Sequence, residues 1–122
     1  MATPESIVRD SICEYLQLHK CFYFIHDSVG IFDPVKQRFR SNTNKHRMKG
    51  VADILGIWQG KPLAIEVKSA RERLTPEQRL FLERFRAEGG ISILARSIDD
   101  VEKALKLTNI NNCLAAKTAI PF

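Results

Sequence analysis

The sequence lacks the features of membrane, secreted and disulfide-stabilised proteins. No apolar run approaches the roughly 20 residues needed to cross a bilayer, and the first turns of the chain carry charges where a signal peptide would be apolar. Its three cysteines (Cys13, Cys21 and Cys113) are odd in number and far apart, which fits neither a disulfide framework nor a zinc site. We therefore expect a reducing, cytoplasmic setting with no membrane partner.

Acidic residues are absent from residues 36–49, although the whole chain has 14 of them. The six basic residues of this stretch outweigh the remainder, in which 13 basic residues face 14 acidic ones, so the stretch accounts for the net charge of +5. Such a concentration is typical of a surface that meets a polyanion at one place, with a solvated loop as the alternative. The six residues are Lys36, Arg38, Arg40, Lys45, Arg47 and Lys49.

Length and patterning predict one α/β domain, because 122 residues suffice for a single core and no repeat or linker interrupts them. Helices are expected to start at Thr3-Pro4, at Thr75-Pro76 and at Ser97-Ile98, and the first two are expected to end near His19 and at Gly89-Gly90. Residues from Asn109 onward show no clear pattern. The predicted strands are Cys21–His26, a weak return strand Val35–Arg40 after a turn at Phe32-Asp33-Pro34, Val51–Trp58, Pro62–Ser69 and Ile91–Ala95.

Two of these strands should form a hairpin that brings charged side chains together. Gln59-Gly60-Lys61 is a short connection, which would pair Ile57 or Trp58 with Pro62. Continuing that register places Asp53 opposite the region from Glu66 to Lys68. Glu66 and Lys68 share one face of their strand because side chains alternate.

Two carboxylates and a lysine at one place indicate a metal site. Neighbouring carboxylates repel one another unless a proton, a lysine or a divalent cation compensates them. Mg²⁺ suits oxygen ligands and keeps several waters, and the peptide carbonyl of Val67 is a further candidate ligand. Lys68 would then orient a water or stabilise developing charge. The alternative is an ordinary surface salt bridge between Glu66 and Lys68.

Two other polar residues are expected to face the same place. Glu5 shares a helical face with Val8 and Ile12, although an acid near a helix start is also explained by the helix dipole. Gln78 shares a face with Phe81 and Phe85, but it also has the spacing of a capping-box partner of Thr75.

These motifs together resemble the VRR-NUC domain of the PD-(D/E)XK nuclease superfamily. The resemblance rests on Gly50–Leu55, Glu66–Ser69 and Leu74–Gln78, and extends from about Pro4 to Leu107. It implies a restriction-endonuclease-like α/β core in residues 1–108, in which a mixed β-sheet is flanked by helices. Residues 109–122 would form a C-terminal tail that could associate with a dimer partner. Ala52 departs from the proline often found there, a position without a chemical role.

The resemblance also implies metal-dependent hydrolysis of phosphodiester bonds with Mg²⁺ or Mn²⁺. Asp53 and Glu66 would be metal ligands, Lys68 the catalytic lysine, Glu5 a ligand reached through water, and Gln78 a further catalytic residue. The basic stretch would bind DNA phosphates at the mouth of the site, with Arg71 and Arg73 on the opposite rim.

Chain length and resemblance favour a structure-selective endonuclease of bacterial or phage type that cuts four-way (Holliday) junctions as a homodimer. Two symmetric cuts by a small chain with one site require two copies. A flap or restriction-type nuclease and a non-catalytic nucleic-acid-binding domain are the alternatives. The sequence shows no major-groove recognition helix and no His-Asn-His nuclease pattern.

Overall fold

The computed structural model describes residues 3–27, 31–40, 45–110 and 120–122. Within these residues, a four-stranded sheet of order β1-β4-β5-β6 forms the centre of the domain. Its strands are β1 (Phe22–Ile25), β4 (Ile54–Trp58), β5 (Lys61–Val67) and β6 (Ile91–Ala95). The first three pair antiparallel, and β5 pairs parallel with β6, so the sheet is mixed as predicted.

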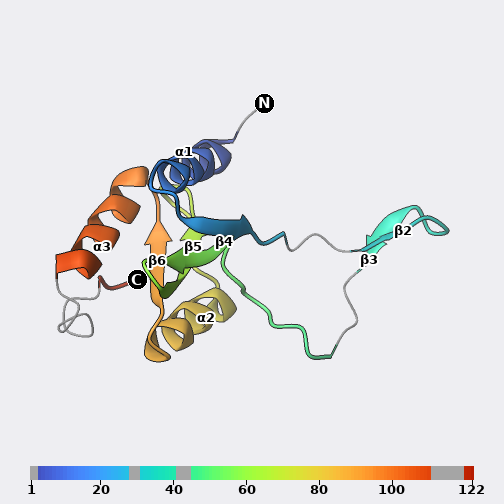
Figure 1. The fold of residues 1–122 in the computed structure, drawn as a ribbon. Coiled ribbons are helices and arrows are strands. Elements are labelled where there is room, and N and C mark those ends of the chain that lie inside the picture. The colour runs from blue at the N-terminus through green and yellow to red at the C-terminus, as the bar shows by residue number, and fades with distance from the viewer. Residues whose placement is uncertain (1–2, 28–30, 41–44, 111–119) are drawn as a thin grey trace.

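Helices cover both faces of this sheet (Figure 1). On one face lie α1 (Pro4–Leu18) and α3 (Ile98–Ile110), and on the other lies α2 (Pro76–Ala87). The first two predicted helix starts are confirmed: Thr3 and Thr75 both act as N-caps, each followed by proline at the first helical position. The α/β fold class is therefore confirmed.

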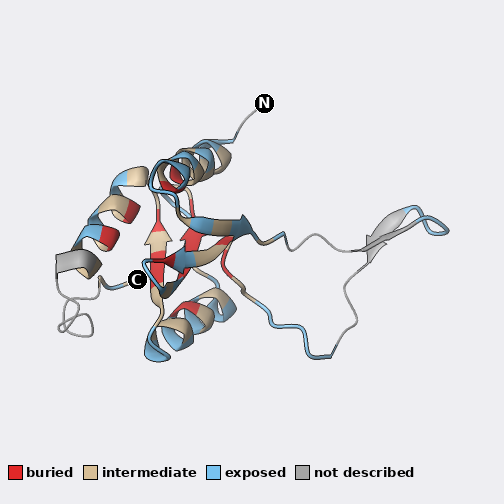
Figure 2. Cartoon of the chain, viewed as in Figure 1, coloured by how far each residue is buried: buried red, intermediate tan, exposed pale blue. Residues whose placement is uncertain are grey.

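The alternation of side chains along β5 divides the interior into two clusters. Leu63, Ile65 and Val67 join the larger cluster under α1 and α3, whereas Ala64 joins a smaller cluster under α2. Both faces of β5 are buried, which the continuous burial from Leu63 to Lys68 reflects (Figure 2). Phe122, at the end of the chain, packs against the smaller cluster and lies under the guanidinium of Arg86 at 3.9 Å.

The predicted β4–β5 hairpin is confirmed. Ile57 pairs with Pro62, and the turn residues Gln59 and Gly60 both have positive φ angles (48° and 82°). Positive φ at both central residues is the geometry of a type I′ turn, whose twist matches that of the flanking strands. The turn therefore sets the register that places Asp53 next to Glu66.

The basic stretch begins in a separate hairpin that lies away from the central sheet (Figure 1). It consists of β2 (Ile31–Asp33) and β3 (Arg38–Arg40), which pair only with each other among the described strands. The predicted turn at Phe32-Asp33-Pro34 is wrong in its position. Phe32 and Asp33 belong to β2, and the turn runs from Pro34 to Gln37, where a φ of 53° reverses the chain.

Several further strand boundaries differ from the prediction. The return strand is shorter than residues 35–40, the strand predicted from Val51 begins at Ile54, β1 is shorter than residues 21–26, and β5 covers residues 61–67 rather than 62–69. The helix α3 continues to Ile110. The expected boundary between residues 108 and 109 thus falls inside the last turn of α3. No helix among the described residues is long and apolar enough to cross a membrane.

Candidate active site

Asp53 and Glu66 lie side by side where β4 begins and β5 ends. The pairing of Ile54 with Ile65 leaves them next in register. The backbone N–H of Asp53 donates to Glu66 Oε2 at 3.2 Å, and the N–H of Val67 donates to Asp53 Oδ2 at 2.9 Å. These reciprocal bonds fix both carboxylates against the backbone of the opposite strand.

Glu66 is held on every side and is nearly inaccessible, with 3% of its surface exposed. Its Oε1 accepts a hydrogen bond from Gln78 Nε2 at 2.9 Å and lies 3.9 Å from Lys68 Nζ. Burial, followed by the neighbouring Asp53 carboxylate, raises the pKa of Glu66 from 4.5 to about 8. The neighbouring groups therefore do not fully compensate the negative charge of ionised Glu66, which a bound cation or a proton would neutralise.

Lys68 is also buried, which distinguishes its ion pair from a surface salt bridge. Only 9% of the residue is exposed, and its backbone N–H continues the sheet by donating to the carbonyl of Ala95 at 3.0 Å. A surface pair of solvated side chains would contribute little. Here the sheet fixes the lysine beside the acid.

Gln78 serves the helix and the site with one side chain. Its Oε1 accepts from the backbone N–H of Thr75 at 3.0 Å and closes the capping box, while its Nε2 donates to Glu66. The two interpretations of Gln78 that the sequence left open therefore hold together. The start of α2 is tied directly to the carboxylate at the end of β5.

Glu5 lies at the edge of this cluster, in the first turn of α1. Its carboxyl hydrogen-bonds to that of Glu72, and its pKa is raised, first by burial and then by this bond. Asp53 and Lys68 also act electrostatically on Glu5, which places it within reach of the site without direct contact to Glu66 in the hydrogen bonds described. Glu72 in turn accepts from the backbone N–H of Ser69 at 3.2 Å, and its pKa is lowered mainly by its hydrogen bonds to Ser69.

The predicted DNA-binding residues lie on three separate segments of the chain. Lys45, Arg47 and Lys49 are exposed on the segment that leads into Asp53, and Arg71 and Arg73 are exposed just after Lys68. Lys36 is exposed in the turn of the β2–β3 hairpin. Arg38 and Arg40 are in β3, and their side chains lie outside the described part of the structure.

Gly50 explains how the basic segment reaches the site. Its φ is +75°, and a Cβ placed there would lie 2.4 Å from the carbonyl carbon of Glu77 at the start of α2. Only glycine permits this close approach of two backbones. Residues 47–49 are thereby held beside α2 and next to Asp53.

Sequence reasoning missed two residues that support the loop after Lys68. Glu72 binds Glu5 and Ser69, and the guanidinium of Arg96 donates to the carbonyl of Ser69. Glu72 and Arg96 carry no motif, and each is far in sequence from a residue that it contacts. The close approach of residue 50 to α2 had one local signal in the sequence, which is that this residue is glycine.

Side chains would supply only some of the oxygen ligands that a hard cation needs at this site. Among the described residues, no group of three or more His, Cys, Asp or Glu side chains gathers as a metal-binding set. Asp53 and Glu66 supply two carboxylates, so any further ligands would be backbone oxygens, waters or phosphate. Mg²⁺ is commonly held in this way, by one or two carboxylates together with water and substrate.

Comparisons with solved structures find the same fold in other proteins. One solved structure, titled "VRR_NUC domain", aligns with a TM-score of 0.59 and 22% identity over 86% of this chain and 97% of its own. Another, titled "VRR_NUC domain protein", aligns with a TM-score of 0.55 and 20% identity over 87% of this chain and 88% of its own. The shared fold is of the nuclease type. No curated protein matches significantly.

The family is given by the sequence match. The VRR-NUC domain family matches residues 33–99, more than half of the chain, including Asp53, Glu66, Lys68 and Gln78. The chain belongs to the VRR-NUC domain family. Membership makes it a nuclease-type domain with DNA as its substrate class.

Proposed function

We propose that this chain is a Mg²⁺- or Mn²⁺-dependent endodeoxyribonuclease that cuts branched DNA, with four-way junctions as its substrate and a homodimer as its active form. The observation that carries the proposal is the convergence of Asp53, buried Glu66 and buried Lys68 at the adjoining ends of β4 and β5. A module that only bound nucleic acid would gain nothing from acids beside phosphates. The set instead suits phosphodiester hydrolysis.

The residues present fit a divalent ion. Asp53, Glu66 and the carbonyl of Val67 would hold it, with Glu5 acting through a water. All of these ligands are oxygens, and the raised pKa of Glu66 marks a negative charge that a cation would stabilise. A bound ion would polarise the scissile phosphate and lower the pKa of a coordinated water.

The other side chains have roles that follow from their contacts. Lys68 Nζ, beside Glu66, is placed to stabilise charge that develops on the phosphate in the transition state. Gln78 holds Glu66 in one orientation through its Nε2–H. Lys45, Arg47, Lys49, Arg71 and Arg73 are exposed and would contact phosphates on both sides of the cut, together with Lys36, Arg38 and Arg40 of the β2–β3 hairpin.

The preference for branched DNA rests on how these residues are distributed. Phosphate contacts position a protein on DNA without reading its sequence, and the basic residues form a segment and a hairpin with no helix placed for the major groove among the described elements. Paired symmetric cuts in a four-way junction require two sites, which a homodimer supplies.

The direct test is cleavage of labelled four-way junctions, flaps and linear duplex in Mg²⁺ and in EDTA. We expect metal-dependent cutting of junctions. Absence of cutting on every substrate would refute the enzyme, whereas preference for flaps, or for one sequence in linear duplex, would replace the junction with the other nuclease classes.

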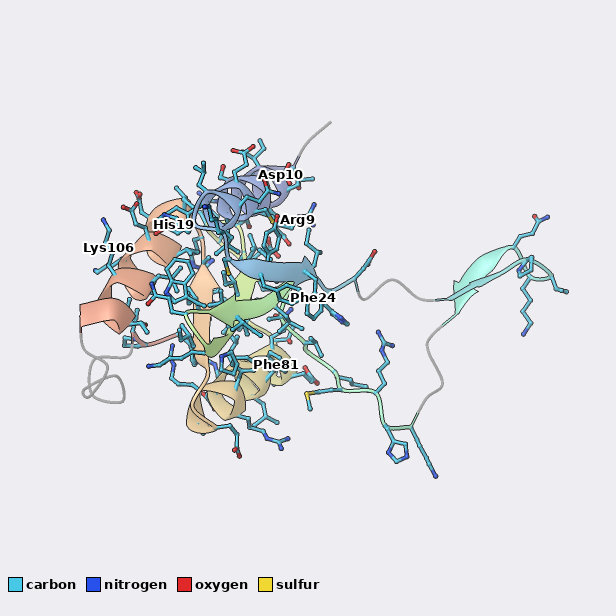
Figure 3. The ribbon with its side chains drawn as sticks, viewed as in Figure 1. Arg9, Asp10, His19, Phe24, Phe81 and Lys106 are labelled. Atoms are coloured by element: carbon cyan, nitrogen blue, oxygen red, sulfur yellow. The ribbon has the colours of Figure 1, made fainter. Side chains whose placement is uncertain are left out.

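Variants of the site separate chemistry from binding. Lys68→Ala should abolish cutting and leave junction affinity nearly unchanged. The matched control is Lys106→Ala, which removes a lysine from a solvent-exposed pair with Glu102 on the outer side of α3 (Figure 3). Equal activity of the two variants would mean that the site is wrongly assigned.

A further inference from the structure

The face of the sheet that carries α2 is only half covered. α2 lies over β5 and β6, whereas α1 and α3 together contact β1, β5 and β6 on the opposite face. Among the described residues, Leu55 of β4 packs into the cluster under α2, whereas the other side chains of β1 and β4 on that face have no helix above them. Phe24 of β1 and Phe81 of α2 are labelled in Figure 3.

The uncovered side chains are large and apolar. Phe22 is 67% exposed, Phe24 53% and Ile57 50%. They share one face, because Phe22 pairs with Ile57, and Ile57 pairs in turn with the exposed Pro62 of β5. Tyr23, between the two phenylalanines, points to the other face and packs into the larger cluster.

A groove continues this surface toward α2. It has a volume of about 440 Å³, and its apolar wall consists of Met48, Pro62, Leu80, Phe81 and Phe85. Pro62 belongs to both the groove and the row of exposed residues, so the two are continuous. We call this surface the apolar face and define it by Phe22, Phe24, Ile57, Pro62, Met48 and Leu80.

Among the described residues, no strand pairs with the outer edge of β1 next to this face. β1 is an edge strand with the sequence Phe-Tyr-Phe-Ile, and it carries no charged residue and no proline. Edge strands that face water usually carry such residues, because an apolar edge invites association with another chain. The apolar composition of β1 is typical of a strand that another chain covers in the functional assembly.

We propose that the apolar face is the homodimer interface, packed against the same face of a second copy of this chain. The charges around the groove favour this occupant: Arg84 of α2 lies among Glu77 and Glu88. A two-fold interface places a surface against itself, so a rim with both signs can pair with its own copy. The two glutamates oppose a nucleic-acid backbone at the same place.

The size of the face agrees with a dimer. Phe22 and Phe24 expose roughly 200 Å² together, and with the half-exposed aliphatic residues the apolar face reaches on the order of 400 Å². A standard interface buries about 800 Å² on each partner, of which a little over half is apolar. The face thus supplies about the apolar share of one partner's surface.

The location rests on the homodimer of the proposed function, and its test needs neither metal nor DNA. The association constant of the full chain is measured by sedimentation equilibrium in EDTA. The variant is Phe22→Thr/Phe24→Thr, which keeps β-forming residues in β1. The matched control is Ile7→Gln/Leu18→Gln, which removes two exposed apolar residues from α1 (55% and 83% exposed).

We expect the wild type and the control to dimerise equally, and the double phenylalanine variant to dissociate with a Kd higher by roughly tenfold or more. Leu80→Lys, on the surface of α2, should weaken the dimer in the same direction without touching β1. A monomeric wild type, or unchanged dimers in both face variants, would overturn the proposal. Dimers that persist while DNA affinity falls would assign the face to nucleic acid instead.

The two proposals fail separately. A chain that dimerises through this face but cuts no DNA would contradict the nuclease and leave the interface standing. A chain that cuts junctions while the face variants remain dimeric would contradict the interface and leave the nuclease standing.

Discussion

The buried carboxylate Glu66 should make the stability of the metal-free protein fall as pH rises. Its pKa is about 8 in the folded chain, against 4.5 for an ordinary glutamate. Between these two values the folded state holds a proton that the unfolded state has lost, so the free energy of unfolding decreases with pH. The loss begins near the lower value and levels off above the higher one.

The magnitude follows from the size of the shift. The change from 4.5 to about 8 corresponds to about 5 kcal/mol at about 1.36 kcal/mol per pKa unit, an upper value because the site can relax and admit water. A chain of this length loses roughly 4 °C in Tm for each kcal/mol. Even half of the limit would lower Tm by about 10 °C between about pH 5 and pH 9.

A divalent cation should reverse this trend. A cation bound to ionised Asp53 and Glu66 stabilises the form that is unfavourable in its absence. The Tm gained on adding Mg²⁺ should therefore be larger at about pH 9 than at about pH 5, where a proton occupies Glu66. Thermal unfolding followed by circular dichroism in EDTA and in Mg²⁺ measures both slopes.

The variant Glu66→Gln isolates the contribution of this one carboxyl group to the pH profile. It should show a flatter pH profile in EDTA and a smaller gain from Mg²⁺. A wild-type Tm in EDTA that stays level from about pH 5 to pH 9 would refute the reasoning, as would a slope that survives in Glu66→Gln.

The remaining predictions concern the supports of the site. Gly50→Ala should cost about 2 kcal/mol or more in chemical denaturation because its Cβ would meet the backbone of Glu77, whereas Gly60→Ala, with similar φ but open space, should cost about 1 kcal/mol; equal losses would contradict the close approach. Gln78→Ala should lower stability by about 1–2 kcal/mol through loss of the cap and of the bond to Glu66. Gln78→Glu should keep the cap yet lose more stability relative to the wild type at about pH 9 than at about pH 6, because it adds a carboxylate beside Glu66. A loss relative to the wild type that is equal at both pH values would argue against this. Replacing Lys45, Arg47 and Lys49 by alanine should reduce the salt dependence of DNA binding by up to about 2.7 in log–log slope, and an unchanged slope would place these residues away from phosphate.

Most of the sheet and the geometry of its central hairpin could be predicted from local signals. The turn at Gln59-Gly60 fixes the register, and alternation along β5 then determines which side chains share a face. Threonine and proline at both helix starts act within a few residues of one another, so the sequence pattern contains them fully. The proximity of Asp53 and Glu66 follows from these facts alone.

Other features depend on contacts between distant segments. Asp33-Pro34 is typical of a turn, but the cross-strand pairing of Phe32 with Phe39 keeps Asp33 in β2 and moves the reversal to Pro34–Gln37. Residues 51–53 resemble a strand, yet the packing of Gly50 on α2 holds them out of the ladder. The bond from Glu5 to Glu72 joins the first helix to a loop more than sixty residues later, and no local pattern encodes it.

The isolation of the β2–β3 hairpin has a consequence for how proteins with this core diverge. Because its strands pair only with each other among the described elements, substitutions there do not disturb the packing of the central sheet. Most changes in a protein are constrained by the stability that they remove. Residues in this hairpin escape that constraint, so the length and charge of the hairpin can be altered while Asp53 and Glu66 keep their places. The DNA contacts proposed for this hairpin can therefore change without a compensating change in the central sheet.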